Sequence, residues 1–393
     1  MYFQPLLLLL LQYKIYNSFK NLPQGWDIFV KHDVFLQSKY LQAIQNASPN
    51  NIQWFYIGIF KTKRLVGIAI VQNVNLYLKN IYREAPTSSI KTFFKDLISK
   101  VFKGNLLVVG NLTHTGQHGL YFDKKEILQI EFLNSIFYAL NEIKKRIKTS
   151  QNIDIKGIMF KDYFKNDTIH EEKNIFEFNN FHKVFVQPNM VFSVQPKWLN
   201  IDDYTTSLTK KYRDRYKRSR KKNKETKVVE LSLEDIKNKA TVLHDLYKNV
   251  SNNAKFNTFL LPKNHFYSLK FHLKENFKVY GYFLDNELIG FYTLILNNRT
   301  LETYFLGYNS EYQSLYQLYL NMLYDMVAFA IDNNYKTIVY ARTAMAIKSS
   351  VGAEAKDMAV YLKHTQPFFN IILKQVFKFM NPSQNWKARH PFK

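Results

Sequence analysis

Two stretches of the chain decide its fold: FYIGIFKTKRLVGIAIVQ (Phe55–Gln72) and VYGYFLDNELIGFYTLIL (Val279–Leu296). Gly58 aligns with Gly281, and Gly67 aligns with Gly290, at one constant offset. Self-similarity at a fixed spacing indicates a repeated structural unit.

Each copy predicts a β-hairpin. A run of strand-forming residues passes through a short polar turn and resumes at a Leu-Val-Gly or Leu-Ile-Gly step. In the second copy Asp285–Asn286 supply residues that tolerate the left-handed backbone of a tight hairpin turn.

The surroundings of the two hairpins also repeat. After each we expect a strand, a long amphipathic helix and a further strand, because the apolar residues change from alternation to helical spacing. In the first copy these elements are residues 105–109, 125–147 and 153–160; in the second they are residues 301–306, 312–333 and 337–340. The sequence therefore predicts a duplicated α+β domain, each copy a mixed, twisted sheet flanked by helices.

The boundary between the copies is expected in Gln187–Asn200, which contains two prolines. We expect an apolar N-terminal segment over residues 1–20, domains over 21–190 and 191–375, and a tail over 376–393. The run Leu6–Leu11 follows a proline and has no basic residue before it. It is therefore interpreted as a buried or membrane-grazing segment rather than a secretion signal.

Several stretches resemble a known family: QPNMVF (187–192), DYTTSLTKKYRDRYKRSRKK (203–222), FLGYNSEYQ (305–313), ARTAMAIKSSVGA (341–353) and WKARHPFK (386–393). They are similar to GNAT (N-acetyltransferase-like) proteins of Bacteroidetes type, which are related to the Fem-type peptidoglycan-bridge aminoacyltransferases. The resemblance implies two tandem GNAT-like domains, each with the acyl-CoA N-acyltransferase fold. It also implies an enzyme that transfers an acyl group, acetyl or another, to an amine, in lipid or cell-envelope biosynthesis.

One segment departs from the family. Acetyl-CoA-dependent GNAT enzymes hold the pyrophosphate on a glycine-rich loop at the start of the central helix, through backbone N–H groups and the helix dipole. The matching segment here, GYNSEYQS (Gly307–Ser314), has one glycine and the carboxylate of Glu311. Fem-type enzymes lack the same loop, and the resemblance implies that they use aminoacyl-tRNA. The donor is therefore left open among acyl-CoA, acyl-carrier protein and aminoacyl-tRNA, with no tightly bound cofactor.

The resemblance places the chemistry where the fourth and fifth strands of the GNAT fold separate, here 301–306 and 337–340. Tyr304 and Tyr308 are candidate proton donors, because a phenol both donates and accepts hydrogen bonds. Glu302 is a candidate general base on the same strand face as Tyr304. Packing roles for the tyrosines and a solvent-facing position for Glu302 are the alternatives.

Cationic residues supply the candidate binding site. Arg342 and Lys348 follow the last strand of the second copy, and Arg is suited to a phosphate or carboxylate. The run Lys210–Lys224 is the densest charge in the chain and begins with the candidates Lys210, Lys211, Arg213 and Arg215. A helix so basic requires an anionic neighbour such as a nucleotide phosphate, a membrane surface or tRNA, unless it is simply solvated.

Composition restricts the partners and the kinds of chemistry that the protein can have. With 55 Lys and Arg against 31 Asp and Glu, the net charge is +24, which favours anionic partners. The chain has no cysteine, so disulfides, thiolate zinc sites and cysteine catalysis are excluded, and the absence fits a reducing compartment. We expect a cytoplasmic location, and the basic run and apolar ends favour a peripheral position at the inner membrane. His114 and His118 are spaced as metal ligands on a helix, but the glycines around them indicate a loop, and no metal site is predicted. Two other functions stay open: a non-catalytic GNAT-like protein that binds an anionic ligand, and a nucleic-acid-binding protein.

Overall fold

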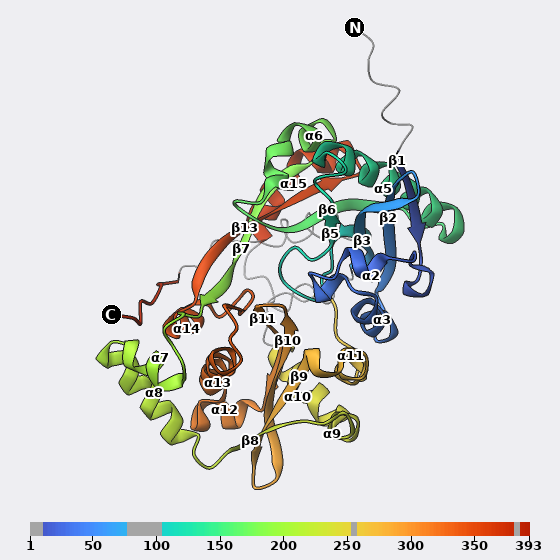
Figure 1. Ribbon diagram of the computed structural model, residues 1–393. Helices are drawn as coiled ribbons and strands as arrows, with labels where there is room; N and C mark the ends of the chain where they lie inside the picture. The colour runs from blue at the N-terminus through green and yellow to red at the C-terminus, as the bar shows by residue number, and fades with distance from the viewer. Residues whose placement is uncertain (1–10, 77–103, 253–257, 381–385) are drawn as a thin grey trace, which may run out of the picture. The chain divides into compact units, whose positions relative to one another are not determined.

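The computed structural model describes residues 11–76, 104–252, 258–380 and 386–393. The described chain divides into two compact units (Figure 1). The division falls between Val186 and Gln187, and again between Lys356 and Asp357. Residues 1–10, which hold most of the Leu6–Leu11 run, lie outside the described residues.

Unit 1 is built on one sheet. Its strands are β1 (Leu11–Tyr16), β2 (Ile52–Lys61), β3 (Arg64–Leu76), β4 (Gly104–Val109), β6 (Ile155–Phe164) and most of β13 (Glu354–His364), in that order, followed by the first part of β7 (His182–Ser193). The short strand β5 (Leu120–Phe122) pairs with β3. All the described pairings are antiparallel except β4 with β6, so the sheet is mixed as predicted.

The helices of unit 1 cover both faces of this sheet. α5 (Gln129–Gln151) lies over the main core, and its residues Phe132, Ile136, Leu140 and Ile143 are buried at helical spacing. α3 (Ser38–Asn46) reaches β2 on its other side, where Gln45 accepts a hydrogen bond from the Tyr56 hydroxyl. The other helices are α2 (Trp26–Phe29), α6 (Lys173–Phe178) and α15 (Pro367–Met380), with single 3-10 turns at Phe19–Asn21, Val34–Leu36 and Thr168–Glu172.

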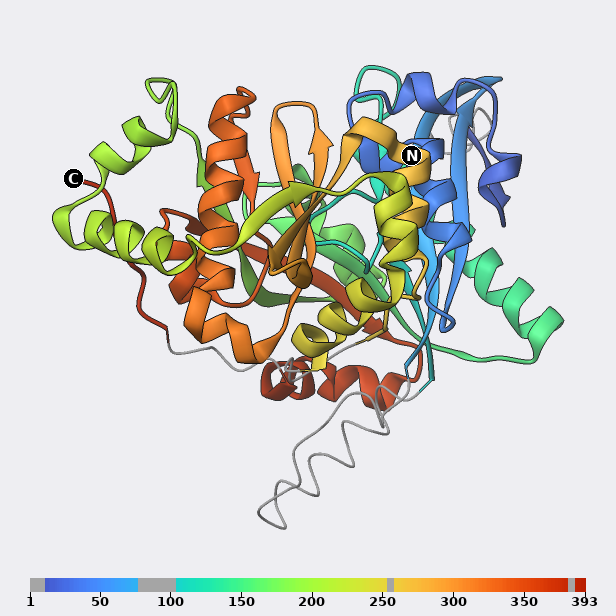
Figure 2. The ribbon, with the colours of Figure 1, turned by 90° about the horizontal axis from the view of Figure 1, so that it is seen from below.

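Unit 2 repeats the plan. Its strands run in the order β7, β12 (Thr337–Val339), β11 (Thr300–Tyr308), β10 (Glu287–Asn297), β9 (Phe277–Leu284) and β8 (Lys227–Glu230). On one face α12 (Ser310–Tyr316) and α13 (Leu318–Asp332) follow β11, and on the other lie α9 (Leu233–Asn238), α10 (Ala240–Asn252) and α11 (His265–Leu273), as Figure 2 shows. The remaining helices are α7 (Ile201–Ser207), α8 (Lys210–Lys222) and α14 (Met345–Ser350), with a 3-10 turn at Lys274–Asn276.

The predicted hairpins are present. β9 and β10 are joined by Asp285 and Asn286, which both have positive φ (46° and 70°), as a type I′ turn requires. Gly58 and Gly281 take the same place in the two registers: Gly58 pairs with Ile68, and Gly281 pairs with Phe291. The two copies therefore match residue by residue through both hairpins.

The division into units differs from the predicted boundaries at the end of the chain. Residues 357–375 were assigned to the second domain, but β13 pairs with β6 of unit 1, for example Met358 with Phe164 and His364 with Gly157. The described tail residues 386–393 belong to unit 2. One late strand thus completes the sheet of the first unit, a long-range pairing that no local pattern in the sequence indicates.

The long helix predicted over residues 312–333 is interrupted. Gln317 adopts the left-handed conformation (φ 49°, ψ 44°) between α12 and α13. The Gln313 side-chain oxygen accepts a hydrogen bond from the Tyr319 N–H (2.9 Å), which satisfies a donor at the start of α13. The helical spacing of the apolar residues predicted a buried helix, but it gave no indication of the interruption at Gln317.

Candidate functional site

The strand β11 carries a bulge at the centre of unit 2. Leu306 pairs with Tyr292 and Thr303 pairs with Leu294, so Tyr304 and Phe305 together oppose the single residue Thr293. Such a bulge adds one residue to a strand and reverses the alternation of its side chains beyond that point. The bulge therefore decides which candidate residues share a face.

Glu302 and Tyr304 precede the reversal and lie on the face covered by α10 and α11. Leu301 belongs to the core under α13, so the next residue, Glu302, points to the opposite face, where it is buried (6% exposed). The Tyr304 hydroxyl lies 3.0 Å from Nε2 of His265 on α11, and the two rings are stacked. The predicted shared face of Glu302 and Tyr304 fits this geometry.

Tyr308 lies on the other face. Its ring packs against that of Tyr319 on α13, with a centroid distance of 6.3 Å, and burial raises the pKa of its phenol. Without the bulge, Tyr308 would share a face with Tyr304, since they are an even number of residues apart. The structure thus places Glu302 and Tyr304 on one face of the sheet and Tyr308 on the other.

β11 and β12 separate where the predicted site requires it. Their parallel pairing ends at Glu302 with Val339, whereas the pairing of β12 with β7 continues one residue further, where Tyr340 donates its N–H to the Met190 carbonyl oxygen (2.8 Å). Thr303 reaches β12 by its hydroxyl alone, which donates to the Val339 carbonyl oxygen (3.0 Å). Because the Asn309 N–H points to Ile289 of β10, alternation directs the N–H groups of Leu306 and Tyr308 to the edge that β12 has left.

The loop after β12 is strained and tied down. Ala341, Thr343 and Ala344 all have positive φ (59°, 66° and 47°), a region that residues other than glycine rarely adopt. Nζ of Lys348, which is 5% exposed, donates to the carbonyl oxygens of Ala341 (3.2 Å) and Arg342 (2.6 Å). Strain of this kind persists where the surroundings over-determine the backbone, and it is concentrated at functional sites.

Burial shifts both cations of this loop. It lowers the pKa of Lys348 to about 7 and that of Arg342 to about 10. The Lys348 ammonium group donates two of its hydrogen bonds to carbonyl oxygens of the loop itself, so in the structure it holds residues 341–342 in place. A role in ligand binding for either residue stays a prediction.

The segment that replaces the pyrophosphate loop is closed by its own side chains. Asn309 caps α12, and its side-chain oxygen accepts from the N–H of Glu311 (3.0 Å). Glu311 adds a carboxylate to the first turn. Both features oppose the binding of a second anion at this helix start.

The predicted basic run forms helix α8, which packs on α13. Arg220 makes an ion pair with Asp325 (2.6 Å) and donates to Asn321 (3.2 Å), and its guanidinium lies over the rings of Tyr216 and Tyr324. Lys210 and Lys211 are exposed, and Arg213 and Arg215 are half-buried. The candidates of this run therefore belong to a separate surface that extends along α8.

Unit 1 differs from unit 2 at the position of the bulge. Ile70 of β3 corresponds to Thr293 of β10. Val71 pairs with Val109, and Ala69 pairs with Leu120, so the whole stretch Gly110–Gly119 takes the place of the two bulge residues. Ile70 closes the stretch, because it donates to the Gly119 oxygen and accepts from the Gly110 N–H (both 2.8 Å). A Cβ on Gly119 would lie 2.3 Å from the Gly110 Cα, so this closure requires glycine.

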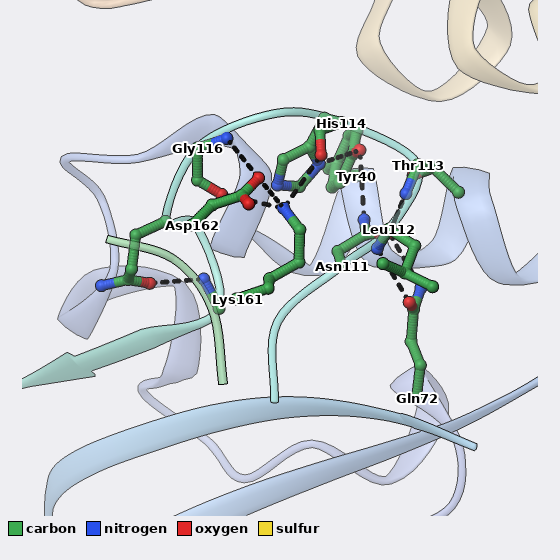
Figure 3. A network of polar contacts seen from close by, with 11 residues as sticks. Tyr40, Gln72, Asn111, Leu112, Thr113, His114, Gly116, Lys161 and Asp162 are labelled. Atoms are coloured by element: carbon green, nitrogen blue, oxygen red, sulfur yellow. Dashed lines mark hydrogen bonds and ion pairs between the residues drawn. The ribbon is translucent and has the colours of Figure 1, made fainter. Parts of the chain in front are cut away.

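This loop is fastened to β6 by a buried ion pair (Figure 3). Lys161 and Asp162 are almost completely buried, with 2.8 Å between Nζ and Oδ2. Lys161 donates to the carbonyl oxygens of His114 (3.0 Å) and Gly116 (3.1 Å), and Asp162 accepts from the Gly116 N–H (3.1 Å). The pairing of β4 with β6 continues to Val109 with Phe160, so the two strands stay paired where β11 and β12 separate.

The two histidines of the loop face different partners. Nδ1 of His114 lies 3.1 Å from the Tyr40 hydroxyl, and Nδ1 of His118 lies 2.7 Å from Oδ2 of Asp33. Burial, with the charge of Lys161 nearby, holds the pKa of His114 well below its usual range, so this ring is neutral. Over the described residues, no group of three or more His, Asp or Glu side chains is arranged to hold a metal.

Sequence reasoning missed His265, Lys161 and Asp162. His265 comes from a helix well before Tyr304 in the chain, and no spacing rule connects them. Lys161 and Asp162 follow directly after the strand predicted over residues 153–160, and no local pattern marks them. Only the pairing of β4 with β6 places them under the loop.

Comparisons with known proteins agree with this architecture. Residues 210–349 match the acetyltransferase (GNAT) domain family. Among solved structures, the chain resembles FemX, with 12% identity over 88% of this chain and 96% of that one and a TM-score of 0.54. It also resembles a tandem GNAT protein from the clavulanic acid biosynthesis pathway, with 8% identity over 91% of this chain and 99% of that one and a TM-score of 0.52. Among curated proteins, no sequence match is found.

The predicted α+β fold with two GNAT-like domains is confirmed, and the chain is a tandem GNAT-fold protein. The match to the acetyltransferase (GNAT) domain lies in the second unit, over residues 210–349. No helix among the described residues has the length and apolar character needed to span a bilayer.

Proposed function

We propose that the protein is an N-acyltransferase of lipid or cell-envelope biosynthesis whose reacting centre lies on β11 of unit 2. The observation that carries this proposal is the pair of features at one place: the bulge at Tyr304–Phe305 and the end of the β11–β12 pairing at Glu302–Val339. Together they leave backbone N–H groups of β11 directed to an edge without a β12 partner, beside a buried carboxylate and a phenol.

The reaction is a direct transfer between donor and acceptor. The acyl carbonyl accepts hydrogen bonds from the N–H groups of Leu306 or Tyr308, which stabilise the negative charge that develops on oxygen. The amine nitrogen attacks, Glu302 takes its proton, the C–N bond forms and the C–S bond of the thioester breaks. Tyr304 gives a proton to the departing thiolate, and its hydroxyl is held by His265. No covalent enzyme intermediate is required, in keeping with the absence of cysteine.

Arg342 and Lys348 are the proposed contacts for an anionic group of the substrate. Arg342 follows the strained end of β12 directly, and Lys348 holds the carbonyl groups of that turn. Because Lys348 is buried and its pKa is lowered to about 7, a bound phosphate or carboxylate would favour its charged form.

The test is thiol release by the full chain. A panel of acyl-CoA donors is mixed with amine acceptors, and free CoA is followed with a thiol reagent, which sees no background because the chain has no cysteine. We expect release that depends on the acceptor and that Glu302→Gln reduces at least about a hundredfold. The matched control is Glu287→Gln, an exposed carboxylate at the hairpin turn, which keeps full activity. Equal activity in the two variants would remove Glu302 from the mechanism.

A second candidate is a Fem-type transfer from aminoacyl-tRNA to a peptidoglycan precursor. The observation that favours it is the start of α12, where Asn309 and Glu311 occupy the place of a pyrophosphate. Acyl-carrier protein is the third donor to include. Transfer from charged tRNA alone would move the assignment to this candidate, and failure of all three donor classes would favour a non-catalytic protein that binds an anionic ligand.

A further inference from the structure

Helix α8 has two faces of opposite character. Its inner face packs on unit 2 through Tyr212, Tyr216, Ser219 and Arg220, which recur at helical spacing. Its outer face carries six exposed cations: Lys210, Lys211, Lys217, Arg218, Lys221 and Lys222. The helix is therefore fixed to the domain by one side and presents a dense positive charge on the other.

Asp214 is the one carboxylate of α8, so the residues of the helix itself offset only a small part of this charge. Of the basic residues of α8, Arg220 alone forms an ion pair with a described residue, Asp325. Like charges at i,i+3 and i,i+4 on a helix repel one another. Such an arrangement is stabilised by an external anionic surface rather than by the protein itself.

The described tail extends this surface. Thr209, just before α8, donates its N–H to Pro391 (2.8 Å), and Leu208 bridges to Phe392. Lys387 and Arg389 of the same tail are exposed. The basic surface of α8 is defined here as the six outer cations of the helix together with these two residues.

One exposed leucine precedes a helix that contacts α8, and another lies on a helix that contacts it. Leu199, immediately before α7, is 80% exposed, and Leu315 on α12 is 62% exposed. Both α7 and α12 contact α8. Basic residues combined with exposed apolar side chains are the composition of an element that lies at a membrane interface.

The aromatic residues of α8 argue against a single-stranded nucleic acid as the partner. Proteins that bind single-stranded RNA stack bases on exposed aromatic rings. Tyr212 is only 8% exposed, and the Tyr216 ring is packed against Tyr324 at a centroid distance of 4.8 Å. No stacking platform is available on the outer face of the helix.

From these observations we infer that the basic surface of α8 is a docking surface for a bilayer that contains anionic lipid. Each Lys or Arg near such a surface adds to the electrostatic attraction between the protein and the bilayer. This attraction falls off within a Debye length, and added salt shortens that length, so binding weakens as salt is raised. The inference concerns α8 and its neighbours alone, so it does not depend on the proposed acyl transfer.

The experiment is co-sedimentation of the full chain with vesicles of phosphatidylcholine, with or without phosphatidylglycerol. We expect binding to the anionic vesicles only, and loss of binding as salt is raised. The double variant Lys217→Glu, Lys221→Glu should bind at least about tenfold more weakly. The control Lys227→Glu, Lys263→Glu changes the net charge equally at exposed positions on β8 and before α11, and should bind as the unchanged chain does.

Two further readouts separate the alternatives. The variant Leu315→Ser should also weaken vesicle binding, because the leucine side chain enters the interface. Unchanged binding of this variant would indicate a purely electrostatic contact and would overturn the interfacial role of the leucines. Circular dichroism and the thermal midpoint show that each variant is folded. The inference is overturned if anionic vesicles are not bound, or if both charge variants bind equally. Binding of tRNA that requires Lys217 and Lys221, without vesicle binding, would assign the surface to RNA.

Discussion

The Tyr304 hydroxyl lies 3.0 Å from Nε2 of His265, and the two rings are stacked with an interplanar angle of 18°. His265 is completely buried at the start of α11, so the surrounding side chains hold its ring in one orientation. The contact thus fixes the direction of the phenol at the bulge of β11. His265 is a positioning residue for Tyr304 in the proposed reaction.

The first prediction concerns this pair. Tyr304→Phe should lower kcat by roughly a hundredfold or more with little change in KM, because it removes a proton donor and keeps the ring. His265→Gln should lower kcat less and shift the pH profile of the reaction, since it alters only the setting of the phenol. The control is Tyr267→Phe on α11, the helix that carries His265. Loss in the control equal to that in Tyr304→Phe would indicate a general effect of α11.

The second prediction concerns the buried ion pair of unit 1. Lys161→Met removes the cation that lies 2.8 Å from the Asp162 carboxylate, in a site that is almost completely closed to water. The free energy of unfolding should fall by about 3–5 kcal/mol, measured by denaturant titration. The exposed pair Arg146–Glu142 on α5 is the control, and Arg146→Met should cost less than about 1 kcal/mol.

Sequence patterns predicted the fold well because they are local. The Leu-Val-Gly and Leu-Ile-Gly steps set the registers of both hairpins, and apolar residues at helical spacing, Leu323, Met326 and Ala330 among them, indicated a buried helix. The position of β13 in the sheet of the first unit could not be predicted in this way, because it depends on the pairing of Met358 with Phe164, which lie far apart in the chain.

The candidate site was predicted only in part, and the bulge explains why. A strand read with strict alternation places Tyr304 and Tyr308 on one face. The extra residue at Tyr304–Phe305 opposes Thr293 and reverses that order. In unit 1, the loop Gly110–Gly119 replaces the bulge at Ile70. Tyr304 and Phe305 have the composition of an ordinary strand and residues 110–119 that of an ordinary loop, so the sequence marks neither insertion.

The third prediction concerns pH. Burial lowers the folded-state pKa of Lys348 to about 7, whereas an exposed lysine titrates near 10.4. The unfolded chain therefore binds more protons than the folded chain between these values, so this group contributes stability that is present above the unfolded pKa and is lost as pH falls towards about 7. The unfolding free energy of the unchanged chain, minus that of Lys348→Met, should rise with pH from about 7 upward. A difference that is flat with pH would contradict the depressed pKa.

The last prediction concerns the contact of β11 with α10. A Cβ on Gly307 would lie 2.4 Å from the backbone carbon of Leu246 and 2.5 Å from the backbone nitrogen of Tyr247, so Gly307→Ala must move the helix or the strand. Overpacking of this kind costs about 1–3 kcal/mol, and the shift should also lower kcat because it displaces the bulge residues that precede Gly307. Gly290→Ala, on the paired strand, is the matched control.

At Gly290 the nearest atom is the flexible end of Met322, at 3.0 Å, which can turn aside. The control should therefore keep both the unfolding free energy and kcat close to those of the unchanged chain. Parallel measurements of the two variants separate geometry at the reacting strand from general damage to unit 2. If Gly307→Ala lowers stability but leaves kcat intact, the bulge is not part of the reacting centre, and the proposed site must be placed elsewhere.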